Sequence, residues 1–182
     1  NFTFTQGTPP GFEKTLTPGQ HYQPLSFTQS GSFDAQLVFA GFGITEDNYD
    51  SFENLDVEGK WIVVLRGHPS VRPGLADSGP LIAKANLARR KGAAGILFVK
   101  GTNEKITTEL FSPDVNIGGN RILPALTLTD QLAAPLLTGK TGTAALRKLF
   151  QTYTRAEKIR GFKLDSRVSV RIGVAARRDQ GR

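Results

Sequence analysis

The sequence has no cysteine and only two histidines, His21 and His68. Without cysteine, no disulfide can support the fold. A zinc site needs three or four His, Cys or carboxylate ligands at short spacing, and two distant histidines without a thiol argue against one. The same scarcity removes cysteine nucleophiles and leaves few bases for a serine or threonine nucleophile. We therefore expect no metal site and no catalytic residue in this chain.

Long apolar runs are also missing. No stretch approaches the roughly 18 apolar residues of a membrane helix. The chain has no methionine and no secretory signal peptide, and it begins at Asn1 and stops at Arg182. We therefore expect an excised or processed part of a longer protein, without a membrane span.

What is present is the composition of a globular domain. The chain has 182 residues, of which 38% are hydrophobic, enough for one sizeable core. The net charge is +7, and the isoelectric point is near 9.9. Most of the excess lies in residues 147–182, where eleven Lys and Arg face three acids. A solvated helix face is the favoured interpretation, with no nucleic acid as partner. The alternative is binding to nucleic acid or another anionic surface through this C-terminal third.

The central pattern of the chain is strand, helix, strand. Residues 60–65 and 95–99 are short apolar runs, typical of strands buried on both faces. Pro80 is expected at the first helical position, and Gly92 is expected to end the helix in a left-handed conformation. Such a βαβ unit predicts parallel strands with a right-handed crossover.

The helix between these strands has a polar and an apolar side. Its apolar residues recur at helical spacing, and we expect four charged residues to point outward. The apolar set is Leu81, Ile82, Ala85 and Ala88, and the outward set is Lys84, Arg89, Arg90 and Lys91.

Further strands and helices complete a mixed α/β pattern. Residues 36–40 predict a strand that ends in a tight Gly-Phe-Gly bend. Residues 122–128 predict a strand at a sheet edge or with a bend, since Pro124 cannot donate to a ladder. Thr129 and Thr143 are expected to cap short helices. Residues 167–174 alternate polar and apolar and predict an antiparallel strand with one wet face.

Three segments are candidates for a metal-binding, catalytic or phosphate-binding site. The acidic residues of segment 46–56 offer oxygen ligands for Ca²⁺, but their spacing is not that of an EF-hand and favours a solvated turn. These acids are Glu46, Asp47, Asp50, Glu53 and Asp56. His68 follows a buried strand, where ligands often bind, which leaves a small α/β hydrolase as an alternative. Residues 134–141 fit a loose phosphate-loop pattern, but the residues before Gly139 read as helix.

The order of these motifs resembles the protease-associated (PA) domain, and more closely the PA domain inserted in bacterial zinc aminopeptidases of the M28 type. The core motifs are two strands ending in glycine turns, a basic helix leading into a Gly-Ile-Leu-Phe-Val strand, and a Leu-Pro-Ala-Leu strand. They occupy residues 37–44, 55–67, 84–99 and 123–126, with matching lead-in segments at 16–19 and 22–27 and an exit strand at 162–174.

The resemblance implies a twisted, partly open β-barrel or sandwich flanked by helices and containing the βαβ unit. It implies no catalytic residues here, because the two zinc ions of such peptidases lie in a separate catalytic domain. The implied role is peptide or protein recognition, gating of the active site or protein interaction. The implied partners are a peptide or protein substrate and the chain's own catalytic domain, and the implied location is secreted or periplasmic.

Division of the chain and candidate contact residues follow from the same resemblance. Residues 1–35 are expected to form an extended lead-in arm with edge strands, and residues 36–182 the PA core with its C-terminal helix and exit strand. The loops at 67–79 and 102–121 match the family's binding loops by position. The candidate peptide-contact residues at or beside these loops are Arg66, His68, Arg72, Asn103 and Asn116.

Overall fold

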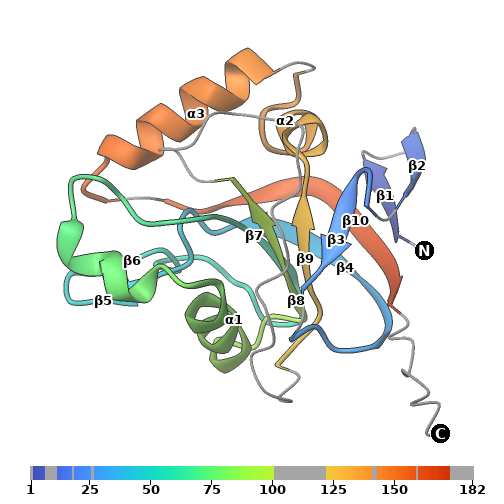
Figure 1. Cartoon of the computed structure of the whole chain (residues 1–182), viewed down its shortest axis with the longest axis horizontal. Coiled ribbons are helices and arrows are strands. Elements are labelled where there is room, and N and C mark those ends of the chain that lie inside the picture. Colours follow the sequence, from blue (N-terminus) through green and yellow to red (C-terminus); the bar gives the residue numbers. More distant parts are fainter. Residues whose placement is uncertain are drawn as a thin grey trace, which may run out of the picture.

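The computed structural model describes residues 2–6, 12–17, 19–25, 27–100, 122–140, 143–158 and 160–172. Within these ranges a mixed eight-stranded sheet carries helices on both faces (Figure 1). The sheet strands are β1 (Phe2–Gln6), β2 (Phe12–Leu16), β3 (Tyr22–Pro24), β4 (Gly31–Phe39), β7 (Trp61–Leu65), β8 (Gly95–Val99), β9 (Ala125–Leu128) and β10 (Phe162–Ile172). The helices are η1 (Pro73–Ser78, a 3₁₀ helix), α1 (Leu81–Arg90), α2 (Asp130–Thr138) and α3 (Thr143–Arg155), and β5 (Thr45–Glu46) and β6 (Tyr49–Asp50) form a separate hairpin.

The strand order across the sheet is β2-β1-β10-β4-β7-β8-β9-β3. Strands β4, β7, β8 and β9 are parallel, whereas β1, β2, β3 and β10 pair antiparallel with their neighbours. This combination confirms the predicted mixed α/β class. β4 crosses the predicted boundary between residues 35 and 36. β10 pairs antiparallel with β4 on both sides of that boundary, from Phe162 to Ile172.

The βαβ unit is confirmed. β7 and β8 pair in parallel from Trp61 opposite Gly95 to Leu65 opposite Val99, and every residue in both strands is buried. Pro80 stands one position earlier than predicted: its ψ of 139° is extended, so it caps the helix and Leu81 begins it. Gly92 has the expected left-handed conformation, with φ of 85°.

Two apolar clusters form the core, one on each face of the sheet. Side chains alternate along a strand, so Trp61, Val63 and Leu65 join the cluster with α2 and α3. Ile62 and Val64 join the other cluster, with α1. The molecule therefore has three layers, with α1 on one side of the sheet and α2 and α3 on the other (Figure 1).

The packing of Trp61, the first residue of the central strand β7, requires a glycine at position 95. A Cβ atom at Gly95 would lie 2.4 Å from the Trp61 ring, closer than any real contact. The indole is fully buried and meets the Phe33 ring edge to face, with centroids 6.1 Å apart. The glycine that opens β8 thus leaves room for the largest side chain in the core.

Of the two alternatives predicted for the strand at residues 122–128, an edge position or a bend at Pro124, the edge position is wrong, and the strand itself begins only at Ala125. β9 lies inside the sheet, between β8 and β3. Pro124 precedes the paired residues, and its carbonyl accepts a hydrogen bond from the Ile96 N–H at 2.9 Å. The missing proline N–H therefore falls just outside the ladder, where it does not prevent an interior strand.

Candidate functional site

The carboxyl ends of the parallel strands β4, β7 and β8 meet at one edge of the sheet. In open sheets with parallel strands, ligands bind outside this edge. The chain leaves the strands there at Ala40, Arg66 and Lys100, and the N–H of Leu65 donates to the carbonyl of Gly41 at 2.7 Å. The turn after β4 and the loop after β7 therefore lie against each other.

The loop after β7, residues 66–80, carries three of the predicted contact residues. It is fastened at two points. Ser70 donates from both its N–H and its hydroxyl to the carbonyl of Thr154 at the end of α3, at 3.0 and 3.1 Å. Leu75 in η1 is 2% exposed and packs into the core. The loop thus presents its polar side chains from an anchored backbone.

His68 is half-buried and directed to its own loop. Its Nδ1 lies 3.0 Å from the carbonyl oxygen of Pro69. Since a carbonyl only accepts, this contact favours the tautomer with the proton on Nδ1 and leaves Nε2 as an acceptor. The nearby Ser70 hydroxyl donates to Thr154 and not to His68. The two side chains therefore do not form the nucleophile–base pair that a hydrolase using His68 needs.

Arg72 and Arg66 complete the predicted set on this loop. The Arg72 guanidinium lies 5.9 Å from the centre of the buried Tyr49 ring, within cation–π range. Burial raises the pKa of Tyr49. Arg66 is half-buried at the end of β7, and its N–H donates to Val99 at 2.8 Å. Asn103 and Asn116 lie outside the described residues.

Lys84 corrects the sequence-based expectation that it points outward. Its side chain is 1% exposed, and its ammonium donates to the carbonyl oxygens of Leu65 at 2.7 Å and Gly67 at 2.6 Å. The Nζ atom also lies 5.6 Å from the centre of the Phe42 ring. Burial, and secondarily the charge of Arg66, lowers the pKa of Lys84 to about 7. Lys84 thus ties α1 to the start of the loop after β7.

The burial of Lys84 could have been predicted from the spacing of the residues in α1. Leu81, Lys84, Ala85 and Ala88 follow the i, i+3, i+4, i+7 pattern of an inward face. Residue type suggested an outward Lys84, but position placed it in the interior. The carbonyls of Leu65 and Gly67, at and just after the end of β7, supply the partners that a buried ammonium needs.

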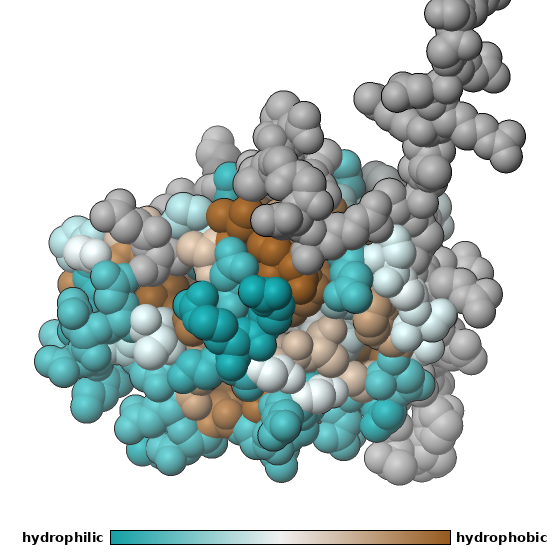
Figure 2. All heavy atoms as spheres, turned by 90° about the horizontal axis from the view of Figure 1, so that it is seen from below, coloured by the Kyte–Doolittle hydropathy of each residue, from teal (hydrophilic) through white to brown (hydrophobic). Residues whose placement is uncertain are grey.

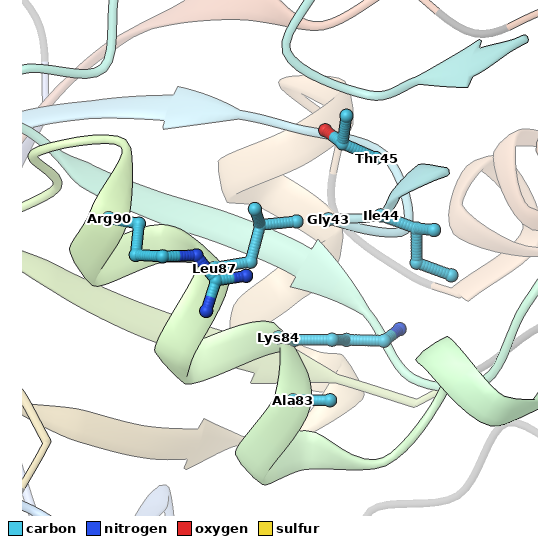
Figure 3. Close-up of a pocket in the computed structure, with 7 residues that line it drawn as sticks. All are labelled: Gly43, Ile44, Thr45, Ala83, Lys84, Leu87 and Arg90. Atoms are coloured by element: carbon cyan, nitrogen blue, oxygen red, sulfur yellow. The ribbon is translucent and has the colours of Figure 1, made fainter. Parts of the chain in front are cut away.

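A hollow opens beside Lys84, between α1 and the turn after β4 (Figure 3). Its volume is about 100 Å³, and it is lined on one side by α1 and on the other by residues 43–45. The side chains that matter for its chemistry are Ile44, Thr45, Ala83, Lys84, Leu87 and Arg90. Sequence reasoning did not find this site, because its two walls are brought together only by the parallel pairing of β4 and β7.

The acidic segment 46–56 folds as the β5–β6 hairpin and the turns after it. Asp50 accepts hydrogen bonds from the Thr45 hydroxyl at 2.7 Å and the Phe52 N–H at 2.9 Å. Asp56 pairs with Lys60, whose hydrogen bond lowers the pKa of that carboxyl. Among the described residues, no group of three or more His, Cys, Asp or Glu is placed to hold a metal ion.

The phosphate-loop pattern at 134–141 closes a helix and does not open one. Gly139 ends α2 in the left-handed conformation, with φ of 66°, and its N–H donates to the Pro135 carbonyl at 2.9 Å. The Thr138 hydroxyl donates to Ala134 at 2.6 Å. The backbone N–H groups that cradle a phosphate belong to a helix start, so this segment has the wrong polarity for that role.

The basic C-terminal third is partly described. Arg147, Lys148 and Arg155 are exposed on α3, while Leu146 and Phe150 are buried beneath them. This matches the predicted solvated helix face. Figure 2 shows the opposite face of the molecule, below α1, where hydrophilic side chains surround a smaller apolar area. In the described part of the chain, no helix is long and apolar enough to cross a membrane.

The sequence was compared with models of known protein families, and one family matches. The sequence profile of the PA domain matches residues 33–136, which include most of β4, the βαβ unit, β9 and most of α2. The chain belongs to the PA domain family. A comparison with curated proteins found no match.

Solved structures that resemble this PA domain are parts of larger peptidases. A zinc aminopeptidase from Bacillus subtilis matches with a TM-score of 0.51 and 16% identity over 94% of this chain and 29% of its own. An aminopeptidase from Aneurinibacillus sp. strain AM-1 has a TM-score of 0.47 and 18% identity over 94% and 30%. A peptidase M28 precursor from Shewanella amazonensis SB2B has a TM-score of 0.45 and 15% identity over 95% of this chain and 34% of its own. The chain therefore spans about a third of the length of these proteins.

Proposed function

We propose that this chain is the non-catalytic PA domain of a secreted or periplasmic M28-type zinc aminopeptidase. In this role it binds peptide or protein substrate next to the catalytic domain and gates access to the active site. Zinc would be held by that catalytic domain, outside this chain. The described residues offer no zinc ligand set, and no step of peptide hydrolysis is assigned to them.

The observation that carries the proposal is the family match, which covers the strands and loops of the carboxyl edge. A fold neighbour is a zinc aminopeptidase of which this chain covers 29%. The anchored loop 66–80 supplies a preorganised surface, which lowers the entropic cost of binding a peptide.

The first test asks whether the chain itself is an enzyme. We expect the purified chain to show no hydrolysis of leucine p-nitroanilide above buffer, with or without added Zn²⁺. The matched positive control is a zinc aminopeptidase under the same conditions. Turnover that depends on His68, shown by its loss in His68→Ala, would contradict the proposal and support the hydrolase alternative.

The second test asks whether loop 66–80 recognises peptides. In the whole protein, Arg72→Ala should raise KM about twofold to fivefold for a six-residue peptide, the size expected for one surface charge contact. The kcat for that peptide and both constants for leucine p-nitroanilide should stay unchanged. Arg155→Ala, which removes an exposed arginine at the end of α3, should have no effect. Equal losses with both substrates would refute recognition by the loop.

A further inference from the structure

The hollow between α1 and residues 43–45 has positive charge at its walls and no carboxylate in its lining. Arg90 is exposed and has no ion pair or hydrogen bond within the described part of the chain. The Lys84 ammonium is 1% exposed beneath the hollow and is already bound by the carbonyls of Leu65 and Gly67 and the face of Phe42, so the exposed Arg90 guanidinium is the cation open to a ligand. A guanidinium beside a partly enclosed, low-dielectric hollow attracts an anion more strongly than one on an open surface does.

The apolar part of the lining limits which anion fits. Figure 3 shows the Arg90 side chain turned back along α1 beside Leu87, and the Lys84 side chain extending below Ile44. Ala83, Leu87 and Ile44 offer aliphatic contacts beside the Arg90 guanidinium. An anion on a short aliphatic arm therefore matches the lining better than a fully polar anion such as phosphate.

The size of the hollow points the same way. About 100 Å³ holds several water molecules. It lies below the roughly 300 Å³ at which pockets for drug-sized ligands begin. One side chain of a peptide or protein fits this space, whereas a whole small-molecule ligand does not.

Both walls of the hollow are held in place. The Gly43 N–H donates to Ala40 at 2.8 Å, and the Ile44 N–H donates to the buried Ser51 hydroxyl at 3.1 Å. Gly43 has φ of 66°, and a Cβ atom there would lie 2.8 Å from Val64. The nearby Asp50 carboxylate already accepts from Thr45 and faces Lys91 at 4.0 Å. The hollow is therefore a preformed site, which is the usual condition of a specific pocket.

We propose that this hollow binds a carboxylate on a short aliphatic arm, with Arg90 as its direct partner and Lys84 below it. The carboxylate belongs to a peptide or protein, either as a glutamate side chain or as the chain terminus. This inference rests on the proposed function, because it names the chemistry of the peptide that the domain recognises. Lys84, which lines the hollow, also holds Gly67 at the start of the loop that carries His68 and Arg72.

The test is an NMR titration of the ¹⁵N-labelled chain with acetyl-glutamate amide. We expect the amide signals of Thr45 and Leu87 to shift, and the uncharged acetyl-glutamine amide to bind at least about tenfold more weakly, because it lacks the charge-assisted hydrogen bond. Arg90→Gln should weaken binding of the glutamate compound about tenfold. Arg89→Gln removes the same charge from the neighbouring exposed residue and should leave the affinity unchanged.

Further arms identify the source of the anion. Acetyl-diglycine with a free carboxyl group tests the chain terminus, and whichever compound binds more tightly assigns the source. Acetate and inorganic phosphate should both bind more weakly than acetyl-glutamate amide. Equal binding of the glutamine compound, equal effects of Arg89→Gln and Arg90→Gln, or tighter binding of phosphate would overturn the proposal.

The titration also separates this inference from the proposed function. A peptide without carboxylates that shifts signals in residues 66–80, with none at Thr45 or Leu87, would leave peptide recognition standing and remove the carboxylate site. Carboxylate binding in the hollow, together with peptidase activity of the chain alone, would leave the carboxylate site standing and remove the proposed non-catalytic function. The Arg90 variants alter an exposed side chain, and an unchanged ¹⁵N spectrum in the absence of ligand shows that they fold.

Discussion

Lys84 is a charged side chain that the fold buries almost completely. Burying an ammonium costs several kcal/mol unless partners replace its water. Here the carbonyls of Leu65 and Gly67 and the face of Phe42 do so. The compensation is partial, because burial still lowers the pKa of Lys84 to about 7. The protonated form is therefore disfavoured in the folded chain relative to the unfolded one.

This difference predicts a pH dependence of stability. Below pH 7, Lys84 is protonated in both states and contributes no slope. Between about pH 7 and its ordinary pKa of 10.5, the unfolded chain holds the proton and the folded chain releases it. The free energy of unfolding should therefore rise with pH in this window, by up to about 1.4 kcal/mol per pH unit from this group.

Urea unfolding at pH 7, 8, 9 and 10 measures this contribution as the difference between the wild type and Lys84→Met. We expect that difference to grow in favour of the wild type as the pH rises. Lys148→Met, which removes an exposed lysine on α3, is the control with which the Lys84→Met difference is compared at each pH. A constant difference for Lys84→Met would show that its ammonium stays protonated in the fold.

At the same scale, the place of loop 66–80 at the end of a buried strand could be predicted from the sequence, whereas the hollow could not. His68 and Arg72 follow a buried strand, and that position alone assigned them to the carboxyl edge. Arg90 has the same residue type and helix as Arg89, and nothing local separates them. Only the pairing of β4 with β7 brings residues 43–45 to the side of α1 on which Arg90 lies.

At the scale of elements, local patterns predicted β7, α1, β8 and their parallel pairing, because each has its own periodicity and a glycine at its end. The interior place of β9 was not predictable from its residues. Pro124 argued for an edge, but register places it one residue outside the ladder. Register depends on contacts between strands that are distant in the sequence, so a local pattern does not determine it.

The helix η1 is the element that fastens the candidate loop, and it predicts a contrast between two apolar residues. Leu75 is 2% exposed, whereas Val71 is 43% exposed. Leu75→Ala should lower the free energy of unfolding by about 2–5 kcal/mol, because it leaves a cavity in the core. Val71→Ala should change it by less than about 0.5 kcal/mol.

Hydrogen exchange shows where the Leu75 effect arises. In Leu75→Ala, the amides of Ser70 and Leu75 should exchange faster, since their hydrogen bonds to Thr154 and Arg72 depend on the docked loop. The exchange rates of amides in β7 and β8 should increase only as far as the global loss of stability requires. Equal protection of the loop in both variants would mean that Ser70 alone holds it, and Ser70→Ala would then release it.

At the scale of the whole molecule, the first and last described strands lie side by side, although more than 150 residues separate them. β1 pairs antiparallel with β10, and Thr3 stands opposite Ser169. Opposed residues in an antiparallel pair have Cα atoms about 4.5–5.5 Å apart, which is within the range of a disulfide. Because the chain has no cysteine, a pair of introduced cysteines tests this arrangement without competition.

We expect Thr3→Cys combined with Ser169→Cys to form a disulfide in air, seen as faster migration on a non-reducing gel. The bond closes most of the chain into a loop, so the oxidised form should be about 3–5 kcal/mol more stable than the reduced form. Thr3→Cys with Arg167→Cys places the cysteines two positions out of register, where Cα atoms lie about 7–8 Å apart, and should cross-link poorly. Equal cross-linking of both pairs would show that the register of β1 on β10 is not fixed.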